Sequence, residues 1–173
     1  MRPMVYYCRQ YRRLLRVVRY GLFLVLTVQA MDASAGMKTL GAVEQVLILP
    51  WKVTLSARID TGASSSSLHA RDIQVKDDTV EFKLAGPGGS RQVTLPLHGW
   101  RRIRTSEGDG RRPAVRMQLC IGGQLISATV NLIDRSGMNY PLLIGRDVLS
   151  NRFVVDVSQH NMTSLDCPKG NVD

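Results

Sequence analysis

The triplet Asp60-Thr61-Gly62 places one carboxylate where it could do chemistry. It follows the apolar run Val53–Ile59, and an acid followed by a small hydroxyl residue and a glycine favours a sharp turn with the carboxylate at its apex. A carboxylate presented in this way can accept or donate a proton in a cleft. The same triplet is common in ordinary turns after strands, so on its own it indicates a structural turn more than a catalytic carboxylate.

A second segment, residues 141–149, supports the chemical interpretation. Aliphatic residues there lead into Gly145-Arg146 and then into a short helical pattern. The order of a strand, an Asp-Thr-Gly loop, several more strands and then aliphatic residues with a glycine resembles the retroviral-type aspartic peptidases. In that family the second segment crosses beneath the Asp-Thr-Gly loop and supports it.

Several short sequence motifs of the chain are similar to those of a bacterial branch of these peptidases. Its members carry the label ATP-dependent zinc protease and are now regarded as retropepsin-like. The matching motifs are residues 58–63, 67–70, 112–116 and 134–138, and the resemblance spans residues 43–156. Proteins of this branch are often associated with ATP-grasp ligases that add glutamate.

The resemblance implies catalysis by two carboxylates that share one proton, one activating a water and the other polarising the substrate carbonyl. The chain has a single Asp-Thr-Gly triplet, so the second carboxylate would be Asp60 of an identical subunit in a twofold homodimer. Thr61 would lock the two loops together, and Gly62 would let the substrate backbone approach. The residues expected to support the loop are Ala63, Leu143, Ile144, Gly145 and Arg146.

Two features depart from the retroviral pattern. Retroviral enzymes often have an acid two residues after the glycine, which pairs with the arginine of the Gly-Arg segment. Ser64 occupies that position here, so Arg146 needs another partner, either Asp147 or a backbone carbonyl. The chain also lacks a glycine-rich flap of the retroviral kind, and the nearest candidate is segment 99–110, with Trp100 as a lid residue.

The same region is rich in arginine. Its arginines are Arg101, Arg102, Arg104, Arg111, Arg112 and Arg116. A solvated strand face or loop is the simpler explanation. The functional alternative is a subsite for acidic, glutamate-rich peptides, because guanidinium groups pair well with carboxylates. The residues expected to contact substrate are Trp100, Arg101, Arg102 and Arg112.

Other catalytic classes fit the sequence less well. No glycine-rich loop ends in Gly-Lys-Ser/Thr, which argues against ATP, and the histidines 69, 98 and 160 lack the spacing of zinc ligands. We therefore expect no metal and no cofactor, and we expect His69 to be packed or hydrogen-bonded. The serines at 64–67 lack a nucleophile-elbow pattern and are predicted to form a polar loop.

Strands must position these residues. Strands are predicted at residues 42–49, 53–59, 73–76, 79–84, 91–97, 112–121, 124–133, 142–144 and 153–157. Turns are predicted at residues 86–89, 108–110, 122–123 and 136–137, and a short helix at 146–151. This pattern indicates a small all-β barrel or sandwich in one domain, residues 36–173. The resemblance implies a closed barrel with one lobe per chain.

The first 35 residues have the pattern of a secretory signal peptide. Six arginines precede the apolar run 21–28, and small residues follow at 33–35. The run is short for a membrane span, which needs ~20 residues, although an uncleaved anchor is the alternative. Either way the domain would lie outside the cytoplasm, in the periplasm. Six arginines and Asp32 precede residue 36, which leaves 17 basic and 13 acidic residues, a net charge of +4. This small excess gives little support to nucleic-acid binding.

Two cysteines remain after the leader, Cys120 and Cys167. In an oxidising compartment they can pair, or they can stay as free buried thiols. A bridge between them would be worth roughly 4 kcal/mol by the loop-entropy argument.

The sequence thus predicts an exported aspartic peptidase that acts on peptides or proteins as a homodimer. The competing hypothesis is a binding or envelope-assembly module of the same fold, in which Asp60 occupies the turn without catalysing a reaction. Contact with a membrane is expected only if the N-terminal segment stays attached.

Overall fold

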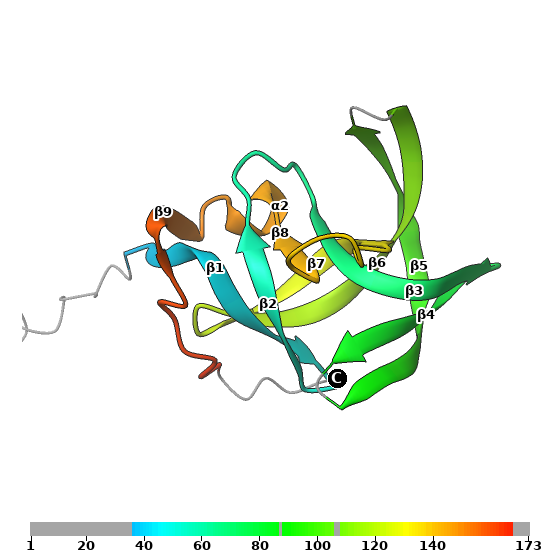
Figure 1. Ribbon diagram of the computed structural model, residues 1–173, viewed down its shortest axis with the longest axis horizontal. Helices are drawn as coiled ribbons and strands as arrows, with labels where there is room; N and C mark the ends of the chain where they lie inside the picture. Colours follow the sequence, from blue (N-terminus) through cyan, green and yellow to red (C-terminus); the bar gives the residue numbers. More distant parts are fainter. Residues whose placement is uncertain (1–35, 87, 106–107, 168–173) are drawn as a thin grey trace, which may run out of the picture. The chain divides into compact units, whose positions relative to one another are not determined.

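The computed structural model describes residues 36–86, 88–105 and 108–167, and the predicted signal peptide at 1–35 lies outside them. The described chain has nine strands and a single helical turn, so the predicted all-β fold is confirmed (Figure 1). The elements are β1 Lys38–Leu49, β2 Val53–Ile59, β3 Ser66–Lys76, β4 Thr79–Gly86, β5 Gly89–Thr105, β6 Gly108–Ile121, β7 Gln124–Ile133, β8 Leu142–Ile144, α2 Arg146–Leu149 and β9 Phe153–His160. Within these residues no helix has the length and apolar content needed to cross a membrane.

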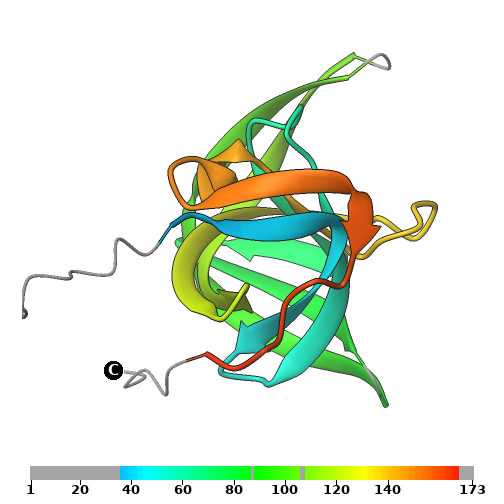
Figure 2. The same cartoon turned by 90° about the vertical axis from the view of Figure 1, so that its left-hand side faces the viewer.

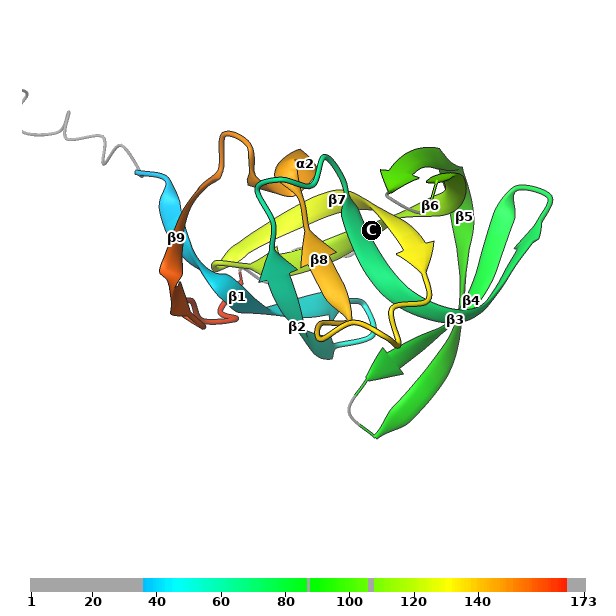
Figure 3. The same cartoon turned by 45° about the horizontal axis from the view of Figure 1, so that its top comes forward.

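The strands pair in the order β4-β5-β6-β7-β3-β8-β2-β1-β9. Two further pairings, β3 with β4 and β1 with β6, curl this sheet back on itself. The pairings thereby close two rings of strands, which share β3, β6 and β7. Figure 3 shows β8 between β2 and β3, where it pairs parallel to β2 and antiparallel to β3.

Alternation of side chains explains how the strands form the core. In β2 every second residue from Val53 to Ile59 is buried, which is the two-residue period of a strand with one face inward. Side chains from the eight other strands join this face in one core, and Phe82 and Leu119 among them are fully buried. Each such side chain contributes about 1.5–3 kcal/mol relative to an exposed one.

The glycine turns were predicted with mixed success. Gly122 and Gly123 join β6 to β7 with φ values of +59° and +69°, as a tight hairpin requires, and this prediction is confirmed. The predicted turn at 108–110 is wrong, because Gly108, Asp109 and Gly110 pair with Thr105, Arg104 and Ile103 within the β5–β6 hairpin.

The predicted polar loop at 64–67 also needs correction. Strand β3 begins at Ser66, and Ser66 and Ser67 are 0% and 4% exposed. The first part of β3 lies between β7 and β8, so neighbouring strands satisfy its backbone. Polar side chains can occupy such a buried strand where their hydroxyls also find partners.

The segment after β9 is tied back to β1 and β6. Figure 2 shows β1 and β9 side by side, and they pair in parallel. The buried carboxylate of Glu44 accepts hydrogen bonds from the N–H groups of Gly41, Met162 and Thr163 and from the Thr163 hydroxyl. A disulfide joins Cys120 of β6 to Cys167, with their Cα atoms 5.9 Å apart.

Candidate active site

Strand β2 delivers Asp60 to a turn that is held by the chain's second predicted segment. The Asp60 N–H donates to the carbonyl of Ile144 at 2.9 Å, continuing the parallel pairing of β2 with β8. The Asp60 Oδ1 atom accepts the N–H of Gly62 at 2.9 Å and that of Ala63 at 3.1 Å. Two backbone donors therefore fix the orientation of this carboxylate.

Arg146 donates hydrogen bonds to three main-chain carbonyls of the same turn. Its main-chain N–H donates to the Ala63 carbonyl at 2.9 Å, and its Nη1 donates to the carbonyls of Thr61 at 3.0 Å and Gly62 at 2.7 Å. Of the two partners that the sequence left open for Arg146, the structure therefore shows backbone carbonyls. Where the retroviral arginine forms an ion pair, the Arg146 guanidinium forms charge-assisted hydrogen bonds to main-chain carbonyls.

Gly145 and Asp147 hold the far end of the turn through Ser66. The Gly145 N–H donates to Ser66 Oγ at 3.0 Å, and the Asp147 carboxylate accepts the Ser66 N–H and hydroxyl. A Cβ at position 145 would lie 2.8 Å from the carbonyl carbon of Ser65, so only glycine allows this close approach. The predicted supporting role of this segment thus has a physical basis in the contacts.

Asn131 on β7 completes the support from the other side. Its Nδ2 donates to the Ser66 carbonyl at 2.6 Å and lies 3.4 Å from Ser65 Oγ. The carbonyl is only an acceptor, so the side-chain nitrogen must face it, and this fixes the amide orientation. The Asn131 Oδ1 is buried and has no hydrogen-bond partner within the described part of the chain.

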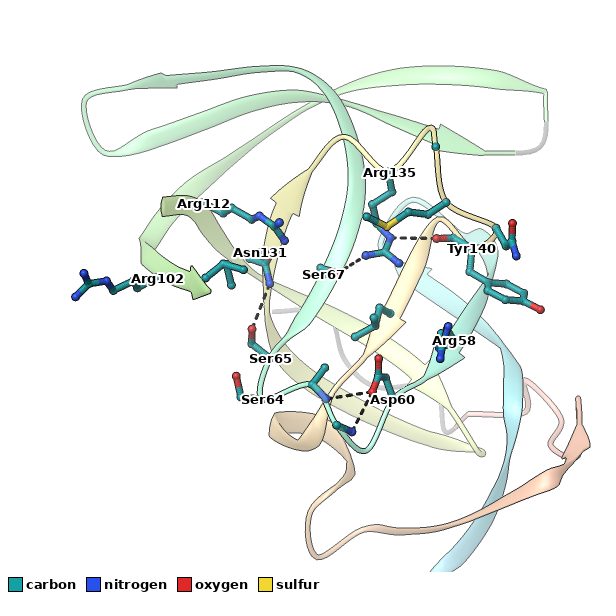
Figure 4. A pocket seen from close by; sticks show the side chains of 17 residues that line it. Arg58, Asp60, Ser64, Ser65, Ser67, Arg102, Arg112, Asn131, Arg135 and Tyr140 are labelled. Atoms are coloured by element: carbon teal, nitrogen blue, oxygen red, sulfur yellow. Dashed lines mark hydrogen bonds between the residues drawn. The ribbon is translucent and has the colours of Figure 1, made fainter. Parts of the chain in front are cut away.

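Asp60 opens onto a cleft of about 860 Å³ (Figure 4). The cleft is lined by Arg58, Asp60, Gly62, Ala63, Ser64, Ser65, Ser67, Arg102, Ile103, Arg112, Asn131, Arg135, Gly137, Met138, Asn139, Tyr140 and Leu143. Asp60 is the one acid among these described residues, whereas four are arginines. The cleft is therefore strongly cationic around a single carboxylate.

Arg135 is the most enclosed of the four arginines, at 7% exposed. Its Nε donates to the Tyr140 carbonyl at 3.0 Å and its Nη1 to Ser67 Oγ at 2.8 Å. Burial lowers the pKa of the Arg135 guanidinium. The positive charges of Arg112 and Arg58 lower this pKa further, and the charge of Asp60 raises it. An arginine pKa starts so high that the guanidinium stays charged at neutral pH. Arg135 therefore holds a fixed positive charge in the cleft wall.

His69 anchors the loop that carries Arg135. Its N–H donates to the Pro141 carbonyl at 2.6 Å, and its Nδ1 accepts the Arg135 N–H at 2.8 Å. Asp134 Oδ1 lies 3.4 Å from the same Nδ1 atom. The prediction of a hydrogen-bonded His69 is confirmed. No three His, Cys, Asp or Glu side chains in the described segments are placed to hold a metal ion.

The candidate flap is the hairpin of β5 and β6, which projects beyond the other strands at the upper right of Figure 1. Arg102 and Arg112 of this hairpin line the cleft. Trp100 and Arg101 do not line it. Trp100 instead lines a smaller hollow beside Arg111, whose guanidinium carbon lies 5.8 Å from the indole centroid.

A family model described as the retropepsin-like aspartic endopeptidase RimB matches residues 39–164. The chain belongs to this RimB-like family. The matched residues include the Asp60 turn, the Gly145-Arg146 segment and the β5–β6 hairpin.

Curated relatives of this RimB-like chain carry a different name. It is 31% identical over 114 residues to a "Probable alpha-L-glutamate ligase" of Shewanella pealeana, covering 61% of the chain and 25% of the relative. A protein of the same name from Parasynechococcus marenigrum is 31% identical over 111 residues, covering 59% and 24%. The chain thus spans about a quarter of the length of the curated relatives it matches.

A solved structure also resembles the chain. It is the crystal structure of protein Lpg0085, of unknown function, from Legionella pneumophila. The TM-score is 0.64 at 29% identity, and the match covers 73% of this chain and 98% of that one.

Sequence reasoning missed two of the four cleft arginines, Arg58 and Arg135. Arg58 sits one position from the buried Ile59 and points to the other face of β2, so strand alternation could have found it. Arg135 follows β7 in a loop, and no local signal predicts that a long-range contact with Ser67 carries it into the cleft.

Proposed function

We propose that the chain is an aspartic-type endopeptidase that acts as a homodimer. The observation that carries this proposal is the Asp60 carboxylate, fixed through Oδ1 by two backbone N–H groups and lining a cleft large enough for a peptide. This arrangement leaves Oδ2 to face a water and a partner carboxylate. Membership of a retropepsin-like family supports the same chemistry.

The second carboxylate has to come from another chain. Asp60 is the one acid among the described residues that line the cleft, and a shared-proton mechanism needs two. A twofold axis beside the turn would bring the two copies of Asp60 together. Thr61 is exposed at this turn, where it could contact its counterpart.

In the proposed reaction the ionised Asp60 takes a proton from water, and the resulting hydroxide forms a bond to the substrate carbonyl carbon. The protonated Asp60 of the other subunit gives its proton to the carbonyl oxygen. When the tetrahedral intermediate collapses, the C–N bond breaks and the leaving nitrogen takes a proton from the dyad. Fully protonated and fully ionised dyads are both inactive, so the rate should fall at both ends of a bell-shaped pH profile.

The preferred substrates would be acidic, glutamate-containing peptides. Four arginines line the cleft against one acid, and guanidinium groups bind carboxylates through two parallel hydrogen bonds. The curated relatives are named for a reaction that involves glutamate, which is consistent with an acidic substrate.

Cleavage of an unbiased peptide mixture tests the proposal. The wild-type protein and Asp60→Asn are incubated with the mixture from acidic to neutral pH, and new termini are identified by mass spectrometry. Asparagine keeps an oxygen for the Gly62 and Ala63 N–H groups, so the variant should fold normally and cleave nothing. Equal cleavage by both proteins, or none by a folded wild-type dimer, would contradict the proposal.

A binding module is the second candidate, and the cationic cleft itself favours it. Such a protein would bind acidic peptides as tightly in Asp60→Asn as in the wild type and release no new termini. The same mass-spectrometric experiment, paired with a binding measurement, separates the two functions.

Export to the periplasm is also part of the proposal. It rests on the sequence of residues 1–35, and N-terminal sequencing of the protein from cells would test it. A mature terminus near residue 36 would support a cleaved signal peptide, and an intact terminus in the membrane fraction would support an anchor.

A further inference from the structure

We propose that Asp147 is a positioning residue for Asp60 and that it acts through Ser66. The inference rests on the proposed peptidase function, because it concerns the geometry that such catalysis needs. Asp147 does not line the cleft, so it would not touch the substrate. Its effect would come from holding the turn that carries Asp60.

Ser66 is fully buried, and every polar group it has is engaged. Its N–H donates to both Asp147 oxygens at 3.1 and 3.0 Å, and its hydroxyl donates to Asp147 Oδ1 at 2.7 Å. The same hydroxyl accepts the Gly145 N–H at 3.0 Å, and the Ser66 carbonyl accepts the Asn131 side-chain amide at 2.6 Å. This degree of engagement makes Ser66 the fixed end of the turn.

The turn from Asp60 to Ser66 is thereby held at both ends by one short segment. At its start, Asp60 donates to the Ile144 carbonyl at 2.9 Å, and at its end Ser66 is held by Gly145 and Asp147. Ile144, Gly145 and Asp147 are close neighbours in the chain, so the separation of the two ends is set by a nearly rigid piece of backbone. A shift of Ser66 would therefore be transmitted to Asp60.

The carboxylate of Asp147 suits this role because three donors converge on it. Besides the Ser66 N–H and hydroxyl, the Val148 N–H donates to Oδ1 at 3.0 Å. An asparagine in its place would turn an NH₂ group toward one of these donors. Ser66 would then have to move, and a displacement of about 1 Å at a catalytic group can cost about 10²-fold in rate.

A kinetic comparison tests this role with a matched control. The variants are Asp147→Asn, Ser66→Ala and the combination of the two, and the control is Asp156→Asn. Asp156 accepts the Ser158 N–H at 2.9 Å and the Ser158 hydroxyl at 2.7 Å, which is the same pair of bonds on β9. We expect Asp147→Asn to lower kcat about 100-fold with KM within about twofold, and the double variant to be no slower than the single one. The control should keep wild-type kcat.

Amide hydrogen exchange provides a readout that does not require activity. The Gly62 and Ala63 N–H groups donate to Asp60, so their exchange reports whether the carboxylate is held in place. We expect exchange at these two amides to be about tenfold faster in Asp147→Asn and unchanged in Asp156→Asn. If the wild type cleaves no peptide, the proposed function fails, and this exchange result alone decides the positioning role.

The inference is overturned if kcat and the exchange of both amides match wild type in folded Asp147→Asn, even where its melting temperature falls. If Asp147→Asn does not fold, Ser66→Ala decides, because it keeps the main-chain bonds to Asp147 and loses only the hydroxyl. A smaller change in the same direction would then support the role, and wild-type behaviour would overturn it.

Discussion

The N–H of Asp60 donates to the carbonyl oxygen of Ile144 at 2.9 Å, which joins two segments that lie far apart in the chain. The bond extends the parallel pairing of Arg58 with Leu143 and of Ile59 with Ile144. The turn and its supporting segment therefore behave as one unit. Substitutions in either segment should be felt at the Asp60 carboxylate.

Gly145→Ala should destabilise the fold. The added Cβ would lie 2.8 to 3.0 Å from the carbonyl groups of Ser65 and Ala63, which are backbone atoms that cannot easily give way. We expect the free energy of unfolding to fall by about 1–3 kcal/mol in urea titrations. Gly137→Ala is the matched control, because its Cβ would meet nothing within 4 Å. Equal stability of the two variants would contradict the close approach.

Arg146→Met should loosen the turn without unfolding the protein. The change removes the bonds from Nη1 to the carbonyls of Thr61 and Gly62, which are exposed, so the cost should be about 1 kcal/mol. The control is Arg152→Met, which removes a guanidinium bond to the Val148 carbonyl away from the cleft. If both variants retained full peptide cleavage, the hydrogen bonds from Arg146 to the turn would have no part in catalysis.

Arg135→Gln should weaken the binding of acidic peptides. In an Asp60→Asn background, calorimetry should show about a tenfold or greater loss of affinity for a glutamate-rich peptide, because a charge-assisted bond is worth about 1.5–3 kcal/mol. Arg116→Gln, an exposed arginine outside the cleft, should have little effect. Added salt should weaken wild-type binding by screening. An equal loss for a neutral peptide would argue against carboxylate recognition.

Cys120→Ser should reveal the contribution of the disulfide. The bridge closes a loop with a sequence separation of 47, for which the chain-entropy model gives about 4 kcal/mol. Urea midpoints should therefore be lower for the variant than for the oxidised wild type, and reductant should lower only the wild type. Insensitivity of the wild type to reductant would mean that the two thiols do not pair in solution.

Asp134 should contribute to stability above acidic pH. Hydrogen bonds from the N–H and hydroxyl of Ser136 lower the pKa of its carboxyl below the ordinary value. A depressed folded-state pKa gives stability that is present above the unfolded pKa, about 3.9, and is lost as the pH falls through the folded pKa. Asp134→Asn should thus be less stable than wild type at pH 6 and closer to it at pH 3. A constant difference across this range would contradict the assignment.

Local patterns predicted most of the scaffold. The bounds of β2, β7 and β8 follow directly from apolar runs that end at turn residues. The start of β3 was missed because four consecutive serines resemble a loop. Only the long-range bonds of Ser66 and Ser67 to Asp147, Asn131 and Arg135 make a buried strand possible there.

The sequence predicted those parts of the site that consist of short contiguous motifs. Asp60 and the Gly145-Arg146 segment each carry a local signature, and the structure brings them together. The cleft wall is assembled from strands β2, β3, β5, β6, β7 and β8 and from the loops at 60–65 and 135–140. Strand alternation could have placed Arg58 in this wall, whereas no local signal groups Arg135 with it. Conversely, an arginine-rich stretch predicted Arg101, which the strand's alternation directs away from the cleft.

The exposed and the buried arginines of the cleft wall should affect different rates of ligand binding. Exposed Arg58 projects its charge into solvent and should raise the association rate of an acidic ligand through electrostatic steering, which salt suppresses. Arg135 is already immobilised by Ser67 and Tyr140, so it loses little side-chain entropy on contact. Its contribution should appear mainly in the dissociation rate, and thus in how long a bound peptide stays beside Asp60.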